Sequence, residues 1–286
     1  MTNTSIASSA MLVDLSISTW TARKLDRGVT DEVNLSKKAS QQASRVNKNL
    51  LPGVEQLDDI VKHASMIRNW VAARTLPWSD YGPRLITTDK FFEFKQELDE
   101  HERVFQDKVD SFLNVYPTLI SMQAFKLGEM FDREEYPDVN EIADKFRFNV
   151  AYLPIPETGD FRVDIGHEAM EEVRQQYERE YEQRLENAMN DVRSRILDSL
   201  NHLSERFTDK DDGTRKRFRN NILDSFAETI ASVRQLNLTK DQAIEAMADE
   251  AEKVIQGVEV DDLKENKDVR DDVRARVDSV LDAFSI

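Results

Sequence analysis

Cysteine is absent from this chain of 286 residues. Its absence excludes disulfide bonds, thiolate nucleophiles, iron–sulfur clusters and cysteine-bound zinc together. Glycine and proline are scarce as well, with 8 and 7 residues, so long segments contain nothing that interrupts a helix. An all-β fold with many tight turns is therefore disfavoured, and we expect a mainly α-helical protein.

The positions of the eight glycines exclude the common phosphate-binding and serine-nucleophile motifs. A Walker loop needs two glycines five residues apart, a dinucleotide fingerprint needs three within six residues, and a serine elbow needs a glycine on each side of the nucleophile. The two glycines closest in this sequence, Gly159 and Gly166, are seven residues apart. We therefore expect a protein that is not an enzyme of a common class and that carries no cofactor.

Histidines are few, and none lies in a His-x3-His or Glu-x2-His pattern. Asp59 with His63, and Glu97 with His101, lie one turn apart on two predicted helices, and the two pairs would face each other if these helices are antiparallel neighbours. Ordinary polar positions on a helix surface or seam account for the same four residues. We therefore expect no metal site.

Long apolar runs are also missing, since no segment approaches the ~18 apolar residues of a membrane span. The first ten residues have neither the basic region nor the apolar region of a signal peptide, so we expect a cytoplasmic protein without membrane contact. The 39 basic and 55 acidic residues give a net charge of −16, which opposes attraction to phosphate backbones. Nucleic acid is thus an unfavoured partner that the sequence does not exclude, and protein partners are expected.

The N-terminal half combines helices with a little β structure. Apolar and polar residues alternate in two places, which predicts a strand over Met11–Thr19 and a β-hairpin over Phe148–Ile165. Helices are predicted over Thr30–Asn49, Val54–Arg74, from Thr88 onward, and over Tyr116–Phe131 with Pro117 in its first turn. Within the second of these helices, one apolar stripe is expected to consist of Leu57, Val61, Ala64, Ile67 and Val71.

The C-terminal half predicts a long helical hairpin. From His167 to Asp212 the chain lacks Gly and Pro, and its apolar residues step by threes and fours, which is typical of one amphipathic helix. A matching stripe from Phe218 to Val233 is expected to fold back antiparallel after a turn, and two shorter helices follow. The predicted domains are a flexible N-terminus at 1–10, a helical body with a small β-sheet at 11–166, and the hairpin with C-terminal helices at 167–286.

Two segments are candidate partner-binding sites. The first is the Pro- and Gly-containing loop after Arg74, which carries Trp78, Tyr81 and Arg84, residue types common at interface hot spots. The alternative is that its aromatic rings fill the junction between a helix and the sheet.

The second candidate is the only dense basic run. It is predicted to lie on the first turns of a helix, where cations oppose the helix dipole. A phosphate or acidic partner would offset that cost, and ion pairing with Asp209, Asp211 and Asp212 is the alternative. The run consists of Arg215, Lys216, Arg217, Phe218 and Arg219.

The chain resembles a family of uncharacterised proteins from tailed phages and some bacteria. The resemblance rests on the segment Leu12–Trp20, on Arg74–Trp78 with Arg84-Leu-Ile, and on the predicted hairpin before a long charged helix. Genes of that family often neighbour a MoxR-type AAA+ ATPase and a protein with a von Willebrand A domain. The resemblance implies a phage-encoded accessory protein that works with an ATPase, with the von Willebrand A domain protein as a further possible partner, and it supplies no catalytic residues.

Three functions remain open at this stage. The leading hypothesis is a non-enzymatic helical adaptor whose hairpin projects as an arm toward another protein. A nucleic-acid-associated phage factor, using the basic run with Arg68, Arg74 and Arg84, is the first alternative. A phage protein that binds and antagonises a host defence is the second. Self-association through helices stays open in all three cases.

Overall fold

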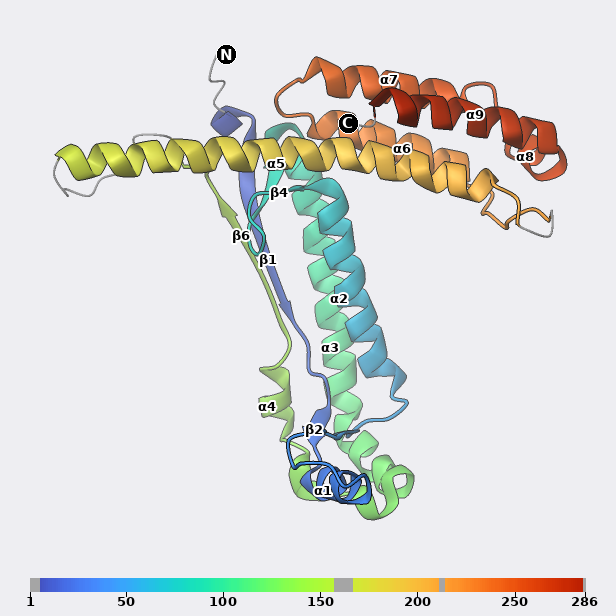
Figure 1. Ribbon diagram of the computed structural model, residues 1–286. Coiled ribbons are helices and arrows are strands. Elements are labelled where there is room, and N and C mark those ends of the chain that lie inside the picture. Colours follow the sequence, from blue (N-terminus) through green and yellow to red (C-terminus); the bar gives the residue numbers. More distant parts are fainter. Residues whose placement is uncertain (1–5, 157–166, 211–213, 285–286) are drawn as a thin grey trace. The chain divides into compact units, whose positions relative to one another are not determined.

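The computed structural model describes residues 6–156, 167–210 and 214–284 (Figure 1). Its fold is mainly α-helical with a small antiparallel β element, which confirms the predicted fold class. The helices of these residues are α1 (Arg27–Ser36), α2 (Glu55–Arg74), α3 (Phe91–Leu127), α4 (Val139–Ala143), α5 (His167–Phe207), α6 (Ile222–Leu236), α7 (Gln242–Ile255), α8 (Val260–Glu265) and α9 (Lys267–Phe284). The strands are β1 (Ala10–Ser18), β2 (Arg23–Leu25), β3 (Asn47–Asn49), β4 (Leu76–Pro77), β5 (Arg84–Thr87) and β6 (Arg147–Leu153). No helix among them is long and apolar enough to cross a membrane.

The chain forms two compact units. Unit 1 contains the N-terminal residues to Asp14, residues 72–92 and the chain from Ala151 onward, whereas unit 2 contains residues 15–71 and 93–150. Residue contacts thus group the chain differently from the sequential ranges 1–10, 11–166 and 167–286, which stay a prediction. One reason is that β1 pairs with β5, which draws the start of the chain to a segment more than 70 residues away.

A four-stranded sheet has the strand order β4-β5-β1-β6. In unit 1, β5 is antiparallel to both of its neighbours, with Leu85 opposite Leu12 of β1 and opposite Leu76 of β4. All three leucines are buried in the core of the unit. The strand predicted over Met11–Thr19 is therefore confirmed, as is the first strand of the predicted hairpin, while the second strand of that hairpin lies outside the described residues.

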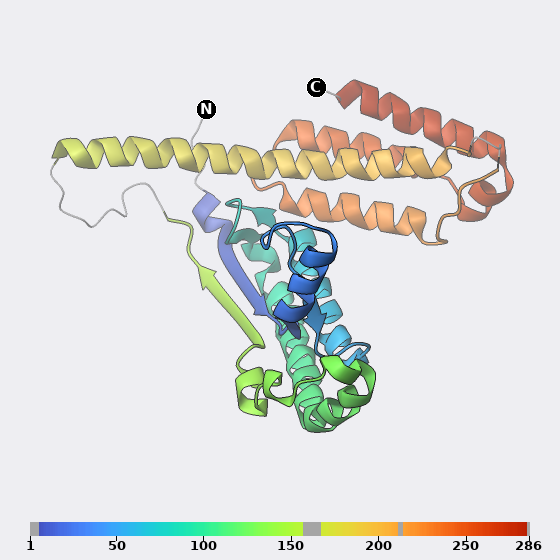
Figure 2. The same ribbon diagram turned by 60° about the horizontal axis from the view of Figure 1, so that its bottom comes forward.

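Unit 1 is built mainly from a helical bundle of α5, α6, α7 and α9. Figures 1 and 2 show α6 running back along the second half of α5, which agrees with the predicted antiparallel hairpin. The two apolar stripes are buried inside the bundle and include Met189, Val192, Ile196, Leu200 and Leu203 on α5, and Phe226, Ile230 and Val233 on α6. The stripes are therefore closed by α7 and α9 instead of remaining open to a partner, and only the first half of α5 extends beyond the other helices of the bundle.

Unit 2 contains the antiparallel pair α2 and α3, which lie side by side in both views (Figures 1 and 2). The ring of Trp70 stacks on Phe94 at a centroid distance of 4.9 Å, close to where α2 ends and α3 begins. The buried stripe of α2 differs from the predicted one at a single position. Ile60 is fully buried, whereas Val61 is 40% exposed.

α3 is one continuous helix of 37 residues with Pro117 inside it, so the helix predicted to begin at Tyr116 is wrong. An internal proline removes one backbone hydrogen bond and costs about 3 kcal/mol. Tyr116 and Ile120 are both buried on either side of it, and their packing holds the backbone helical through the proline. Tertiary contacts therefore outweigh the local preference.

The segment after β2 forms a small lobe of unit 2, which we call the 23–49 lobe after its residues. The single helix predicted over Thr30–Asn49 is wrong beyond Ser36, where α1 ends. Lys38 takes a left-handed φ of 52° and reverses the chain direction. Strands β2 and β3 then pair antiparallel and close the lobe at its base.

Polar side chains fill the inside of this lobe. Asn34 Nδ2 donates to the carbonyl oxygen of Gln41 at 3.2 Å, and the Ser44 hydroxyl donates to Asn34 Oδ1 at 2.6 Å. The backbone N–H of Val46 donates to the hydroxyl of Thr30 at 3.0 Å. Asn, Ser and Thr side chains offer the backbone an alternative to helical hydrogen bonds, which explains why the helix does not continue.

Candidate interaction surfaces

The loop between β4 and β5 carries Trp78, the first of the predicted partner-binding residues. Its ring is buried and packs edge-on against Tyr181 of α5, with ring centroids 5.4 Å apart. The guanidinium of Arg184, one turn further along α5, lies 6.0 Å from the centre of the same ring. Trp78 therefore anchors the loop to α5 within unit 1.

Arg84 fixes the other side of the loop. Its side chain donates to the hydroxyl and the carbonyl oxygen of Thr75, at 2.7 and 3.1 Å. Arg195 of α5 donates to the same Thr75 carbonyl at 2.8 Å and to the carbonyl of Ala72 at 2.9 Å. Two guanidiniums thus satisfy carbonyl groups at the C-terminal end of α2, where backbone acceptors lack helical partners and cations are favoured.

Placing two arginines side by side has an electrostatic cost. Burial lowers the pKa of the Arg84 guanidinium, and the positive charge of Arg195 lowers it further. The carboxylate of Asp191 acts in the opposite direction and pairs with Arg195 at 2.8 Å. Arg84 keeps its charge, because the ordinary pKa of an arginine lies far above neutral pH. The loop is thus held by a compensated cluster of charges.

Tyr81 lies between these two anchors and is 98% exposed. The next residue, Gly82, has a φ of 142°, and a Cβ added to it would lie 3.2 Å from the hydroxyl oxygen of Ser79. The chain turns tightly here, in a conformation that a side chain at this position would strain. Of the three candidate residues in the loop, Tyr81 is therefore the one presented to solvent.

The basic run 215–219 is not helical, so the prediction that it opens a helix is wrong. α6 begins at Ile222, and residues 214–219 form an irregular connection before it. Phe218 packs edge-on against Phe207 at the end of α5, with ring centroids 5.6 Å apart. This contact fixes the run against the bundle. The Phe218 ring, which would have to stack on a ligand, is therefore already packed within the chain.

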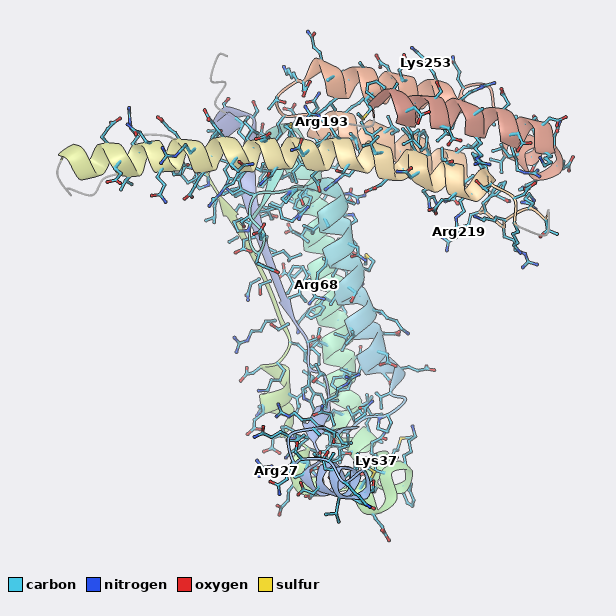
Figure 3. All side chains as sticks on the ribbon, viewed as in Figure 1. Arg27, Lys37, Arg68, Arg193, Arg219 and Lys253 are labelled. Carbon is cyan, nitrogen blue, oxygen red and sulfur yellow. The ribbon has the colours of Figure 1, made fainter. Side chains whose placement is uncertain are left out.

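The cations of this run have different surroundings. The Arg215 guanidinium lies 5.1 Å from the centre of the Phe218 ring, and Lys216 donates to the carbonyl oxygen of Glu205 near the end of α5. Arg217 and Arg219 are exposed and form no ion pair with another described residue (Arg219 is labelled in Figure 3).

The acids proposed to neutralise this run are placed as follows. Asp209 pairs with the buried Arg270 of α9 at 3.3 Å. Asp211 and Asp212 lie outside the described residues. The interaction of the run with a partner stays a prediction.

The two histidines that were weighed as metal ligands do face each other across α2 and α3. Their rings are 5.9 Å apart, and Nε2 of His63 lies 3.2 Å from the carbonyl oxygen of His101, within hydrogen-bond distance. The His101 ring also contacts Trp70 edge-on at 4.9 Å. In the part of the chain that the structure describes, no group of three or more His, Cys, Asp or Glu side chains could hold a metal ion.

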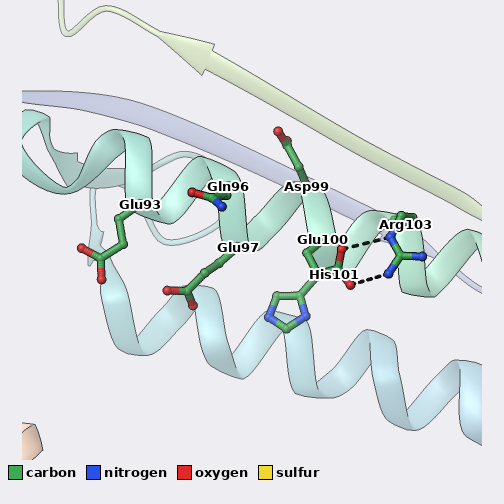
Figure 4. Close-up of a pocket in the computed structure, with 7 residues that line it drawn as sticks. All are labelled: Glu93, Gln96, Glu97, Asp99, Glu100, His101 and Arg103. Carbon is green, nitrogen blue, oxygen red and sulfur yellow. Dashed lines mark hydrogen bonds and ion pairs between the residues drawn. The ribbon is translucent and has the colours of Figure 1, made fainter.

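A shallow hollow lies over the first turns of α3 in unit 2 (Figure 4). Its lining residues all come from this one helix, and Arg103 at one end pairs with Glu100 at 2.5 Å. The ion pair holds the pKa of the Glu100 carboxyl below its ordinary value and that of Arg103 above it. The lining residues are Glu93, Gln96, Glu97, Asp99, Glu100, His101 and Arg103. This arrangement is typical of a charged helix surface and does not bring together an acid, a base and a nucleophile around an enclosed space.

The cations proposed for nucleic-acid binding outside the basic run are already engaged within the chain. Arg68 donates to the carbonyl oxygen of Ile17 at 2.8 Å, and Arg84 binds Thr75 as described above. Arg74 also has a partner within the chain. These three arginines therefore stabilise the fold.

The exposed cations of the 23–49 lobe were not among the predicted site residues. A long helix was expected there, on which cations would have been interleaved with acids. The available signal was the absence of any Asp or Glu between Glu32 and Glu55 in a chain that is otherwise rich in acids.

Comparisons with known proteins give no relative. No protein-family model, no curated protein sequence and no solved structure matches this chain.

Proposed function

We propose that this protein is a non-catalytic adaptor that binds a protein partner through Tyr81 and the loop that presents it. The supporting observation is a fully exposed tyrosine on a loop that is fixed on both sides, by Trp78 on α5 and by Arg84 at the end of α2. Tyrosine is among the residues that most often dominate the binding energy of protein interfaces.

The rigidity of the loop matters for binding. An exposed aromatic side chain on a mobile loop loses backbone freedom when it binds, and that loss weakens the complex. The fixed β4–β5 loop has already lost this freedom on folding, so the area buried by Tyr81 contributes to affinity with little further entropy cost.

The resemblance to the phage family supports a choice of partner. It implies a phage-encoded accessory protein beside a MoxR-type AAA+ ATPase and a von Willebrand A domain protein, and we propose the ATPase as the partner of the Tyr81 loop. The long acidic helices of unit 1 then serve as the scaffold that carries the loop.

A photo-crosslinking experiment tests this function. A photoreactive phenylalanine analogue is placed at Tyr81 and, as a matched control, at Phe125, which is 93% exposed but lies on α3 in unit 2. Each protein is mixed with the purified ATPase and, separately, with the von Willebrand A domain protein. We expect a covalent adduct with the ATPase from position 81 and none from position 125. No adduct with either protein, or equal adducts from both positions, would contradict the proposal.

The Tyr81→Ala variant gives an independent measure. Loss of a hot-spot tyrosine costs about 2 kcal/mol of binding, which weakens the affinity by about thirtyfold. Phe125→Ala is expected to bind like the wild type. Both substitutions remove exposed side chains, so both proteins should melt at the wild-type temperature.

A further inference from the structure

Six cations of the 23–49 lobe stand exposed in unit 2. Their side chains form no hydrogen bond or ion pair with another described residue. They come from β2, from the first turn of α1 and from the segment after it, and Figure 3 labels one at each end of α1. These residues are Arg23, Lys24, Arg27, Lys37, Lys38 and Arg45.

Cations on the long helices have different surroundings. Lys62 lies 3.7 Å from Asp59, Lys95 lies 2.5 Å from Asp99, and Arg103 lies within 3.1 Å of both Glu100 and Asp107. These pairs are three or four residues apart on one helix, which is the ordinary way in which helix surfaces neutralise charge. The lobe lacks such pairs because acids are absent from the sequence after Glu32 until Glu55.

The acids of the lobe leave its cations largely uncompensated. Asp26 caps α1 through a hydrogen bond from the backbone N–H of Val29, and it lies 4.0 Å from the buried Lys48. Lys48 is also paired with Glu135 at 2.5 Å. Within residues 23–49, this leaves Asp31 and Glu32, both exposed on α1, against the six exposed cations.

The lobe holds these cations in a confined space. A hydrogen bond of 2.9 Å from the N–H of Asp26 to the carbonyl of Val46 continues the β2–β3 pairing and brings the backbone of Arg27 beside that of Arg45. Lys37 and Lys38 lie at the other end of α1, a helix of 10 residues and therefore about 15 Å long. One strand of a nucleic acid places about four phosphates along that length.

The residue composition of the lobe favours one class of anionic partner over another. Residues 23–49 contain no aromatic side chain, and the segment between Lys38 and Arg45 consists of alanine, serine and glutamine. Protein interfaces are enriched in aromatic residues and arginine and depleted in lysine and serine. The residues that contact phosphate and sugar include lysine, arginine, serine and glutamine.

We propose that the 23–49 lobe binds the phosphate backbone of nucleic acid without reading its sequence. This function goes beyond the proposed adaptor role and uses other residues. The net charge of −16 does not prevent it, because charges beyond about 10 Å are largely screened at 0.1 M salt. The six exposed cations of the lobe form no ion pair with another described residue, so their charges are available to a phosphate backbone close to the lobe.

Two matched triple variants of the full chain test this inference. The lobe variant carries Lys37→Gln, Lys38→Gln and Arg45→Gln, and the control carries Lys62→Gln, Lys95→Gln and Arg103→Gln. Each variant removes two lysines and one arginine from the surface of unit 2. Binding is measured by fluorescence anisotropy with labelled single-stranded and duplex oligonucleotides of random sequence, over a series of salt concentrations. Circular dichroism and melting curves establish that both variants are folded.

We expect the wild type to bind at low salt and the lobe variant to bind at least about tenfold more weakly. Each lost phosphate contact reduces the log–log salt slope by about 0.7 to 0.9, so the slope should fall by about 2 to 3. The control variant should bind about as tightly as the wild type, because the three cations that it loses are paired with acids on their own helices. Equal loss in both variants, or no binding by the wild type at low salt, would overturn the inference.

Further measurements separate this inference from its competitors and from the adaptor function. Binding to vesicles of phosphatidylserine, or to polyglutamate, without binding to the oligonucleotides would overturn it in favour of a membrane or an acidic protein. Tyr81→Ala should bind the oligonucleotides like the wild type, and the lobe variant should still crosslink to the ATPase from position 81. Each proposal can therefore fail without the other.

Discussion

The helical bundle of unit 1 and the 23–49 lobe of unit 2 distribute polar and apolar groups in opposite ways. In the bundle, buried apolar residues such as Ile196 form the inside, while Arg234 on the outside pairs with Glu245, Asp249 and Glu252. In the lobe, the buried side chains include the polar Thr30, Asn34 and Lys48, and most of the exposed cations have no acid beside them.

This difference shows that the net charge of a chain describes neither of its surfaces. The value of −16 is a sum over the whole chain, in which cations of the long helices such as Lys95 are neutralised by acids on the same helix. The 23–49 lobe, a segment of 27 residues in which basic residues outnumber acidic ones, changes the net charge little. It nevertheless contributes strongly to the electrostatic potential close to its own surface. The net charge of a chain can therefore argue against a nucleic-acid partner only where acidic and basic residues are evenly mixed along the sequence.

Replacing a buried residue of the bundle has the largest expected effect. Ile196 is fully buried between α5 and its neighbours, so Ile196→Ala should lower the free energy of unfolding by about 2 to 5 kcal/mol. Glu186→Ala, at an exposed position of the same helix, should stay within about 0.5 kcal/mol. Urea unfolding followed by circular dichroism measures both. An unchanged midpoint for Ile196→Ala would mean that the bundle is not packed in solution as described.

The bundle could be predicted from the sequence, and the lobe could not, for one physical reason. Periodicity reports where apolar side chains are buried, so it predicted the stripes of α5 and α6. The stripe predicted for α2 was wrong at one position, where Ile60 is buried in place of Val61. The inside of the lobe is held by Asn34 and Thr30, whose hydrogen bonds leave no periodic signal.

The candidate loop was found only in part. Pro77, Gly82 and the aromatic residues predicted an ordered turn, but the roles of its side chains depend on distant residues. Trp78 meets Tyr181, and Arg84 shares Thr75 with Arg195, contacts between segments about 100 residues apart. Sequence spacing carries no information about such contacts, so only the structure separates the anchors from the exposed Tyr81.

Alkaline pH should weaken unit 2, which carries the lobe. Burial raises the pKa of the Tyr116 and Tyr136 phenols from 10.0 to about 12, and the Glu135 carboxylate adds to the shift at Tyr136. Between pH 10 and 12 the unfolded chain loses phenol protons that the folded chain keeps, so unfolding becomes more favourable. The stabilisation is complete below pH 10 and then falls by about 2 kcal/mol for each tyrosine.

Urea unfolding at several pH values, with tyrosinate absorbance as a second signal, measures this effect. The Tyr136 hydroxyl donates to the carbonyl of Leu50 at 2.7 Å, next to the base of the lobe. Tyr136→Phe should therefore lower stability at neutral pH and reduce the further loss above pH 10. A wild-type stability that is constant from pH 9 to 11.5 would contradict the prediction.

Breaking the polar network of the lobe should have a smaller and more local effect. Asn34→Ala removes the hydrogen bonds to Gln41 and Ser44, which we expect to cost about 1 to 2 kcal/mol. Amide hydrogen exchange should accelerate in residues 37–46 while the bundle of unit 1 keeps its protection. Uniformly faster amide exchange across both units would contradict this prediction, because it would show that the lobe and the bundle unfold together.

The smallest expected effect concerns single surface cations and has opposite signs in the two environments. Lys95 pairs with Asp99 on α3, so Lys95→Gln should lower the free energy of unfolding by about 0.3 to 0.5 kcal/mol at low salt. Lys38 follows Lys37 and has no acid beside it, so Lys38→Gln removes repulsion and should raise stability by a similar amount. Both differences should vanish at 1 M salt, where charges are screened within about 3 Å. Urea midpoints at both salt concentrations measure them, and a loss of stability in Lys38→Gln would show that this cation stabilises the fold and is not reserved for a ligand.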